Sequence, residues 1–563
     1  MKRSIVVATV LWLGVAGCTP EPNPQVNQLA VDQTLRVAIP EDIGVFEPLD
    51  PDQLSNPPDY SIAQNLFDGL FRMDDQLQVV PDIAAKMPII SADRLTYTIP
   101  LRPDARFSNG DPVTATDVMY SWNRAVIAGG PFASFSGSAN VFGHIVGYAD
   151  VERALGTGNP PRQLAGLSAP DPHTIHIRFS SPVGDYFLTQ LTLPPAWIVD
   201  QHVIQAGGEQ RWWQHSDSLV GTGPFKMVRR VPGSSMVFAP VPNWWGGGAA
   251  PTLKTVELDV VPDATKILQG YRSGRYDLVG LGDYGPGAAG TKLASQLTVD
   301  PAHASEVHRF NYGRTEWLGF NLQSGPFSGV NGRLGRLALS QAIDPVELAR
   351  AACASGTLCF PATGGLISKG LDGYLGDGSN NVLRFNVRDA RANLQEWDPT
   401  GSVRNRITYV YIANSLFRDV AKNLQRQWRR NLGIEVTLQG YDPATFIYDR
   451  LSGDYALFRA SWAADYNSPE NWYDDLFLGN GAPSSAPGYD SPQFVTTVTQ
   501  AENASGAAAQ NAYQQADRML LEQAVIDPLL YYVHTVVMKP YVAGFGANAL
   551  YDYRWTAIKL LQH

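Results

Sequence analysis

Several segments alternate between apolar and polar residues with the period of two that is typical of half-buried strands. They are residues 95–102, 173–179 and 255–261. Residues 114–126 instead predict a helix that begins near Thr114 or Thr116, since either hydroxyl can cap it.

The clearest helical pattern covers residues 415–433. Apolar residues recur there at every fourth position, and a glycine suited to the C′ position, Gly433, closes the segment. The apolar residues are Leu416, Val420, Leu424 and Trp428. Residues 434–441 follow at once as a further strand. Helices that alternate with strands in this way predict an α/β architecture.

Composition narrows the class of protein. The chain has 563 residues, of which 44% are hydrophobic and 17% charged, so it can bury the cores of several domains. Its formal charge of -10, with no basic run, argues against a nucleic-acid partner. The 13 tryptophans are typical of concave ligand sites as well as of cores.

The N-terminus predicts export. Lys2 and Arg3 precede an apolar stretch that is too short to span a bilayer and has the length of a signal-peptide core. The following "VAGC", Val15 to Cys18, resembles the lipobox of bacterial lipoproteins. That resemblance implies a signal peptide at 1–17, lipid on Cys18 and a tether at 18–33. The protein would then be anchored to the cell membrane, facing the periplasm or the extracellular side. An ordinary cleaved signal peptide with an incidental cysteine is the alternative.

Two further cysteines remain, Cys353 and Cys359. An even pair in an exported chain indicates a disulfide, with two unpaired buried thiols as the alternative. Two cysteines alone, with no other near them, do not make a zinc site.

Enzymatic and cofactor motifs are weak. Residues 280–285 read G-x-G-x-x-G, but Pro286 and Gly287 follow, which is unfavourable for a helix that would bind pyrophosphate. His173 and His176 fall on opposite sides of the predicted strand. The acidic residues at 473–477 could host a glycosidase pair, which leaves a secreted hydrolase as a minor alternative. We therefore expect no cofactor, no metal and no enzymatic activity.

A series of segments in one order resembles the oligopeptide-binding branch of the family 5 extracytoplasmic solute-binding proteins of ABC transporters. The resemblance spans residues 34 to 563. The segments that carry it are 48–54, 64–87, 95–126, 221–227, 242–247, 271–278, 319–327, 339–350 and 539–545.

This resemblance implies a two-lobed clamp with an additional domain, whose lobes close on a ligand by hinge motion. It also implies a monomer that receives an oligopeptide and passes it to an ABC permease with a cytoplasmic ATPase. Domain I would comprise 34–67, 201–313 and 533–563, with a crossing strand in its C-terminal part. Domain II would cover 68–200 and domain III 314–532.

The segment "RASWAADYN" resembles the family's ligand-binding motif, and a peptide is a zwitterion with a polar backbone. By this match Asp465 would bind the α-ammonium, and Ser461 and Ala463 would offer main-chain groups. Alternation puts positions 461, 463 and 465 on one side of an extended segment. Trp462 would form an apolar wall, and Arg459 or Arg450 would meet a carboxylate. The alternatives are a cap for Asp465, core packing for Trp462 and surface ion pairs for the arginines.

The chain also departs from the peptide binders. Phe132 replaces a tyrosine that bonds the ligand backbone, and Gly280 and Leu281 replace polar and aromatic pocket residues, whereas Tyr312 is retained. These changes predict a different, roomier and more apolar pocket. They leave open another solute, such as an oligosaccharide, a haem-like molecule or a metal chelate.

Overall fold

A computed structural model provides the structure. It describes residues 28–40, 49–54, 57–127, 141–155, 163–208, 212–214, 216, 219–246, 250–280, 289–353, 356, 358–404, 406–452, 455–478, 485–550 and 553–563.

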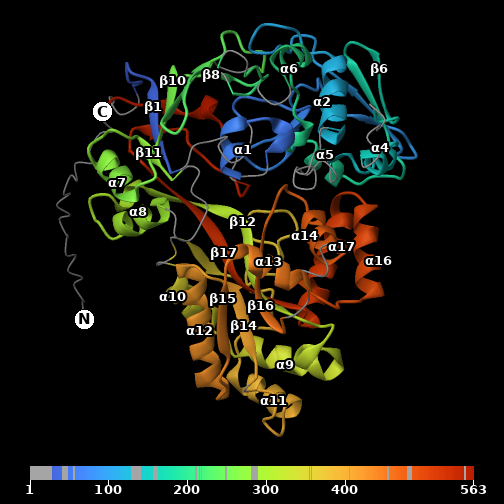
Figure 1. The fold of residues 1–563 in the computed structure, drawn as a ribbon, viewed down its shortest axis with the longest axis vertical. Coiled ribbons are helices and arrows are strands. Elements are labelled where there is room, and N and C mark those ends of the chain that lie inside the picture. The colour runs from blue at the N-terminus through green and yellow to red at the C-terminus, as the bar shows by residue number, and fades with distance from the viewer. Residues whose placement is uncertain are drawn as a thin grey trace, which may run out of the picture.

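One large mixed sheet runs through the molecule from end to end (Figure 1). Its described strands are, in order, β15 (Thr437–Tyr441), β14 (Thr408–Ile412), β16 (Leu457–Ala463), β12 (Val307–Phe320), β17 (Ile526–Met538), β11 (Leu278–Val279), β1 (Thr34–Ile39), β10 (Thr255–Val260), β9 (Ser235–Pro240) and β8 (Phe225–Val231), with β13 (Cys359–Pro361) paired to β17.

The two long strands β12 and β17 join the upper and lower parts of Figure 1. They have 14 and 13 residues and pair antiparallel along most of their length. Their register shifts between Asn311 and Thr315, which indicates a bulge at the level where the two parts of the molecule meet. One of these crossing strands is the C-terminal one that the resemblance implies.

A smaller sheet lies at the upper right of Figure 1 beside α2 (Ala115–Ile127) and α4 (Tyr148–Leu155). Its strand order is β4 (Ile89–Ile90), β5 (Thr96–Pro100), β7 (Thr174–Arg178) and β6 (Leu167–Asp171). Two short pairs complete the described sheets, namely β2 (Phe71–Met73) with β3 (Val79–Pro81) and β18 (Val542–Ala543) with β19 (Lys559–Leu560).

The elements predicted from periodicity are confirmed. β5, β7, β10 and β15 lie within the predicted strand ranges, and α2 matches the predicted helix to within a residue at each end. α12 (Ser415–Leu432) buries the apolar residues that recur at every fourth position and ends at Gly433, whose φ is 69°. That left-handed conformation explains why a glycine stands there.

The remaining helices pack around the sheets. They are α1 (Pro57–Ala63), α5 (Tyr186–Gln190), α6 (Gln201–Gly207), α7 (Ala264–Arg272), α8 (Ala289–Thr298), α9 (Gly329–Gln341), α10 (Pro345–Ala352), α11 (Val387–Trp397), α13 (Pro443–Ser452), α14 (Glu470–Phe477), α16 (Pro492–Glu502) and α17 (Gly506–Glu522). None of the helices in the described ranges has the length and apolarity to cross a membrane.

Buried apolar residues form separate cores. One core gathers mainly residues 70–198 around the smaller sheet, and a second joins the N-terminal strand to residues 197–278 and 536–560. Two more fill the lower part on either side of β12 and β16. We propose that these cores mark the three domains expected from the resemblance, with domain III divided into two faces by its sheet.

Cys353 and Cys359 are joined by a disulfide, with their Cα atoms 4.8 Å apart. Both are fully buried beside α10 and β13. The alternative of two unpaired thiols does not describe this structure.

Candidate ligand-binding cleft

Asp465 lies just beyond the end of β16, where the chain leaves the lower part of the molecule. The two residues after it contact the upper part. The Tyr466 hydroxyl accepts a hydrogen bond from Gln190 Nε2 at 3.2 Å, and Asn467 Nδ2 donates to the Leu77 carbonyl at 3.2 Å. These contacts place Asp465 at the junction of the two parts.

Asn471, in the first turn of α14, holds Asp465 in position. Its Oδ1 accepts from the Asp465 backbone N–H at 3.0 Å and from Trp462 Nε1 at 3.2 Å. Its Nδ2 donates to Asp465 Oδ2 at 3.0 Å and to Asp475 Oδ2 at 2.7 Å. Asn471 is fully buried, so this one amide fixes two carboxylates and the indole of Trp462.

Asp465 is exposed to solvent in this structure, although its carboxylate lies among the protein atoms that line the cleft. This partial desolvation raises the pKa of Asp465 to about 6, while the hydrogen bond from Asn471 works in the opposite direction. No described residue forms an ion pair with Asp465. Burial and then the charge of Asp465 raise the pKa of Asp475 to about 7. A carboxylate that lies in a cleft, has a raised pKa and lacks an ion-pair partner among the described residues is suited to bind a cationic group of a ligand.

Asp465 lines a cleft between the upper and lower parts, called here the interlobe cleft, with about 1100 Å³ of space that is partly open to solvent. The lower wall comes from Tyr312, Ala463, Ala464 and Asp465. The upper wall comes from segments far apart in sequence, namely residues 60–75, 192–197 and 553–554, and includes Phe71, Arg72, Trp197 and Arg554. Asn548 and Leu550 also line the cleft, beside Ala549, which packs in a core of the lower part.

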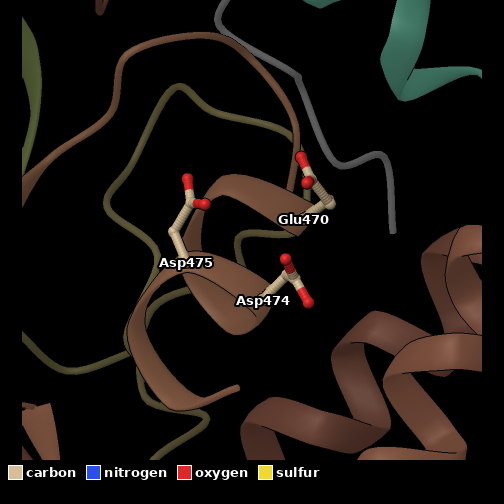
Figure 2. A group of neighbouring side chains, drawn as sticks. All are labelled: Glu470, Asp474 and Asp475. Atoms are coloured by element: carbon tan, nitrogen blue, oxygen red, sulfur yellow. The ribbon is translucent and has the colours of Figure 1, made fainter. Parts of the chain in front are cut away.

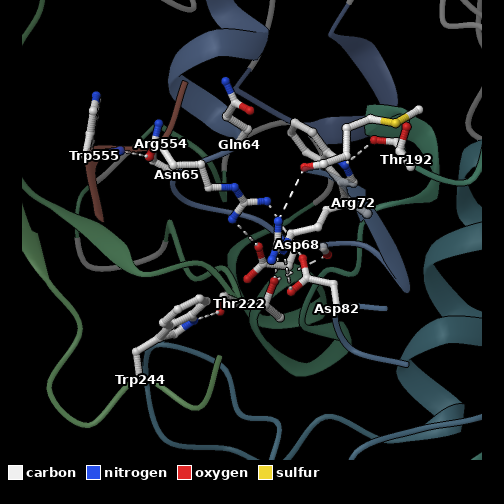
Figure 3. A network of polar contacts seen from close by, with 12 residues as sticks. Gln64, Asn65, Asp68, Arg72, Asp82, Thr192, Thr222, Trp244, Arg554 and Trp555 are labelled. Atoms are coloured by element: carbon white, nitrogen blue, oxygen red, sulfur yellow. Dashed lines mark hydrogen bonds and ion pairs between the residues drawn. The ribbon is translucent and has the colours of Figure 1, made fainter. Parts of the chain in front are cut away.

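A polar network lies behind the upper wall (Figure 3). Arg554 Nη1 lies 3.0 Å from Asp68 Oδ1, and its Nη2 lies 3.8 Å from Asp82. Both carboxylates are buried. Burial, reinforced by the neighbouring charge of Asp68, raises the pKa of Asp82 well above its ordinary value. Thr222 Oγ1 also accepts a hydrogen bond from the Asp68 backbone N–H. This contact and the ion pair with Arg554 hold Asp68 in position in the upper wall.

The edge of β16 offers main-chain groups near the cleft. β14 pairs with β16 only at Leu457 and Phe458, so residues 459–463 have β12 as their single described strand neighbour. Ala463 lines the cleft, and the Ser461 hydroxyl accepts from Arg314 Nη2 at 3.2 Å. An open edge of this kind can pair with an extended peptide.

Two aromatic site residues lie close to Asp465. Tyr312 lines the cleft and has a raised pKa because it is buried, with a further contribution from the charge of Asp465. Trp462 is half-buried and packs against the core on one side of β16, while its indole N–H bonds Asn471. Trp462 therefore supports Asp465 and does not itself line the interlobe cleft.

Arg459 does not reach the cleft, which corrects the expectation that it meets a ligand carboxylate. Its side chain is 3% exposed, and its guanidinium lies 2.9 Å from Glu316 Oε2 and over the ring of Phe417. Tyr532 donates to the same carboxylate oxygen at 2.6 Å. Residues 459 and 461 lie on the same face of β16. At residue 459 that face is covered by a core of the lower part, so the side chain of Arg459 is enclosed by protein.

Gly280 packs against β17 and does not line the interlobe cleft. Its φ is 104°, and a Cβ there would lie 2.7 Å from the Thr535 carbonyl oxygen, so both backbone conformation and space require glycine. Phe132, Leu281 and Cys18 lie outside the described residues, as does the side chain of Arg450 on α13. Their predicted roles stay predictions.

Three acids on α14 form the group of described side chains best suited to hold a metal ion (Figure 2). Oxygens of Glu470, Asp474 and Asp475 lie within 4.8 Å of one another. Glu470 also accepts from the Tyr466 hydroxyl at 2.5 Å, and burial raises its pKa well above the ordinary value. Because Glu470 is already hydrogen-bonded to the Tyr466 hydroxyl, a metal ion would have to compete with that contact for one of its three ligands.

Asn471, Arg72 and Arg554 were not among the residues predicted for the site. Asn471 lies only six residues after Asp465, but nothing in the sequence shows that the helix start folds back onto it. The two arginines lie in segments separated by almost the whole chain. Arg72 and Arg554 reach the same wall only because the long strands of the large sheet return the end of the chain to the upper part.

This fold and cleft define a two-lobed α/β binding protein. The family model described as "Bacterial extracellular solute-binding proteins, family 5 Middle" matches residues 78–484. The chain therefore belongs to family 5 of the bacterial extracellular solute-binding proteins.

Curated relatives match over nearly the whole length. The chain is 28% identical to the periplasmic oligopeptide-binding protein OppA of Escherichia coli, covering 99% of this chain and 98% of that protein. It is 27% identical to the probable deoxycholate-binding periplasmic protein YgiS of the same organism, covering 94% of each. Among solved structures, the unliganded open form of the periplasmic murein tripeptide-binding protein MppA gives a TM-score of 0.79 at 24% identity, over 95% of this chain and 99% of that one.

Proposed function

We propose that this protein captures oligopeptides in the interlobe cleft and delivers them to the permease of an ABC importer. Asp465 binds the α-ammonium of the peptide, and the open edge of β16 pairs with its backbone. Closure of the lobes then buries the ligand. Lipid on Cys18 would keep the protein at the cell membrane, close to the permease, and the protein would act as a monomer without a cofactor.

The observation that carries this proposal is the state of Asp465. Its carboxylate is fixed by Asn471, lies in the cleft and has no ion pair with a described residue. An ammonium group fits such a site because a charge-assisted hydrogen bond contributes about 1.5–3 kcal/mol. The names of the relatives support a peptide ligand, since OppA and MppA are both described as peptide-binding.

Calorimetry with alanine peptides tests the ammonium role. We expect the wild-type protein to bind tetraalanine at least about tenfold more tightly than N-acetyl-tetraalanine. Asp465→Asn should lose this difference, whereas the exposed control Asp490→Asn should keep it. Equal affinity of the wild-type protein for the free and the acetylated peptide would contradict the role of Asp465.

A non-peptide solute is the second candidate. It is favoured by the likeness to a relative named as deoxycholate-binding and by the predicted changes at Phe132 and Leu281. An acid such as Asp465 disfavours a ligand that carries only a negative charge. Native mass spectrometry of freshly purified protein distinguishes the two candidates, since a peptide and a sterol-like acid differ in mass and fragmentation.

A further inference from the structure

Arg459 does not reach the interlobe cleft, and the side chain of Arg450 lies outside the described residues, so a cation for the negative end of a peptide is sought among the described residues of the cleft. The upper wall of the interlobe cleft contributes two, Arg72 and Arg554. They differ in how strongly the protein already engages them.

Arg554 is committed to the network behind the wall. Its side chain is 21% exposed, and its guanidinium bonds the fully buried Asp68 carboxylate at 3.0 Å. Removing Arg554 from that carboxylate would leave a buried charge unpaired, which is strongly unfavourable. Arg554 is therefore poorly placed to exchange its partner for a ligand.

Arg72 is engaged only loosely. Its side chain is 39% exposed, and its nearest carboxylate oxygen, on Asp82, is 3.8 Å away. Its one hydrogen bond to a described residue, from Nη1 to the Met73 carbonyl, is long at 3.4 Å. Asp82 also faces Arg554, whose Nη2 lies 3.8 Å from its other carboxylate oxygen, so Arg72 shares this partner.

We propose that Arg72 binds the carboxylate of the ligand, so that the interlobe cleft selects zwitterionic peptides with a free C-terminus. This inference rests on the proposed function, since it assigns the second end of the same ligand. Arg72 lies on β2 in the upper wall, whereas Asp465 lies in the lower wall. A ligand held at both ends bridges the two lobes, and its binding energy then favours the closed arrangement.

Two other acids of the upper wall, Asp74 and Asp75, form no ion pair with Arg72 among the described residues. Asp74 accepts the backbone N–H groups of Gln76 and Gln78 and so is committed to the turn between β2 and β3, and Asp75 is exposed. Together with Asp465 they make the cleft unfavourable for a ligand with negative charge alone. The ligand class is therefore a molecule with separated positive and negative ends.

Calorimetry with di-, tri-, tetra- and pentaalanine, each as the free acid and as the C-terminal amide, tests the proposal. We expect the wild-type protein to bind the best acid about tenfold more tightly than its amide. Arg72→Gln should bind both forms with the weaker affinity. Arg72→Lys should keep part of the difference, since it retains charge but not the planar fork. Arg178→Gln, an exposed arginine on β7, should behave as wild type.

Two results overturn the inference. Equal affinity of the wild-type protein for acid and amide shows that the C-terminal charge is not recognised, and it leaves the proposed function intact. Full discrimination in a folded Arg72→Gln variant shows that another cation binds the carboxylate. If none of the peptides with a free N-terminus binds, the proposed function itself fails, and this inference fails with it.

Discussion

The guanidinium of Arg459 lies 2.9 Å from the Glu316 carboxylate, and both side chains are almost completely buried. The pair crosses two neighbouring strands, since Arg459 is on β16 and Glu316 is on β12. It also receives the Tyr532 hydroxyl from β17. The pair therefore links three central strands of the lower part just below the cleft.

Removal of Arg459 should damage stability without damaging recognition. Arg459→Met leaves the Glu316 charge buried and unpaired, which costs about 3–5 kcal/mol. We expect a large loss in the urea midpoint but an unchanged Kd for tetraalanine in the fraction that stays folded. The double variant Arg459→Met/Glu316→Gln should recover much of the stability. A folded Arg459→Met variant that no longer binds peptides would restore Arg459 to the site.

Asn471 should act on the ligand through Asp465. In Asn471→Ala the Asp465 and Asp475 carboxylates lose their donor, so both pKa values should rise and the Kd for tetraalanine should weaken by about tenfold or more. The matched control is Asn503→Ala, which removes an exposed amide bonded only to the Thr499 carbonyl. Equal Kd values for the two variants would show that Asp465 does not need this support.

Local elements were predictable because their patterns are local. The apolar residues that recur at every fourth position of α12 are all buried, and its end requires a left-handed residue, so the sequence alone locates the buried face and the end of the helix. The alternation in β5, β7 and β10 reflects one buried face in each strand. Asp465 was identified by its resemblance to a motif, and the structure places it in a cleft.

The environment of each site residue was not predictable in the same way. Arg459 and Ala463 share one face of β16, yet one is buried and the other lines the cleft, because the core of the lower part ends between them. Arg72 and Arg554 reach one wall only through the path of the whole chain. Motif matching gives the residue type at a position, whereas burial and partners depend on packing from distant segments.

The disulfide should stabilise the lower part modestly. Cys353 and Cys359 are separated by 6 residues, and closing so short a loop contributes about 2 kcal/mol on the chain-entropy model. The double variant Cys353→Ser/Cys359→Ser should lower the urea midpoint by at least this amount, because two hydroxyls are also buried. Reductant should lower the wild-type midpoint and leave the variant unchanged. A reductant effect of equal size on both proteins would contradict a role for the disulfide.

Peptide affinity should depend on pH through Asp465. Its pKa is raised to about 6, so the carboxylate is ionised at neutral pH and becomes protonated below about pH 6. The Kd for tetraalanine should therefore weaken about tenfold per pH unit as the pH falls below this value, and should be flat above it. N-acetyl-tetraalanine should show little of this dependence. A flat profile for both peptides down to about pH 4 would mean that no carboxylate of this kind binds the ammonium.

The same carboxylate should make the empty protein less stable at neutral pH. The pKa of Asp465 is higher in the folded state than the ordinary 3.8, so the folded protein binds more protons, and its stability falls as the pH rises from about 4 to about 6. Asp465→Asn removes this penalty. The Tm of the variant without ligand should exceed that of wild type at about pH 8, and the difference should vanish below about pH 4. Because solvent reaches the carboxylate, the gain should be at most about 1 kcal/mol. A variant that is less stable than wild type at neutral pH would show that Asp465 serves the fold. If Asp465 is retained for ligand binding, Asp465→Asn should instead raise the Tm of the protein without ligand and weaken its affinity for tetraalanine.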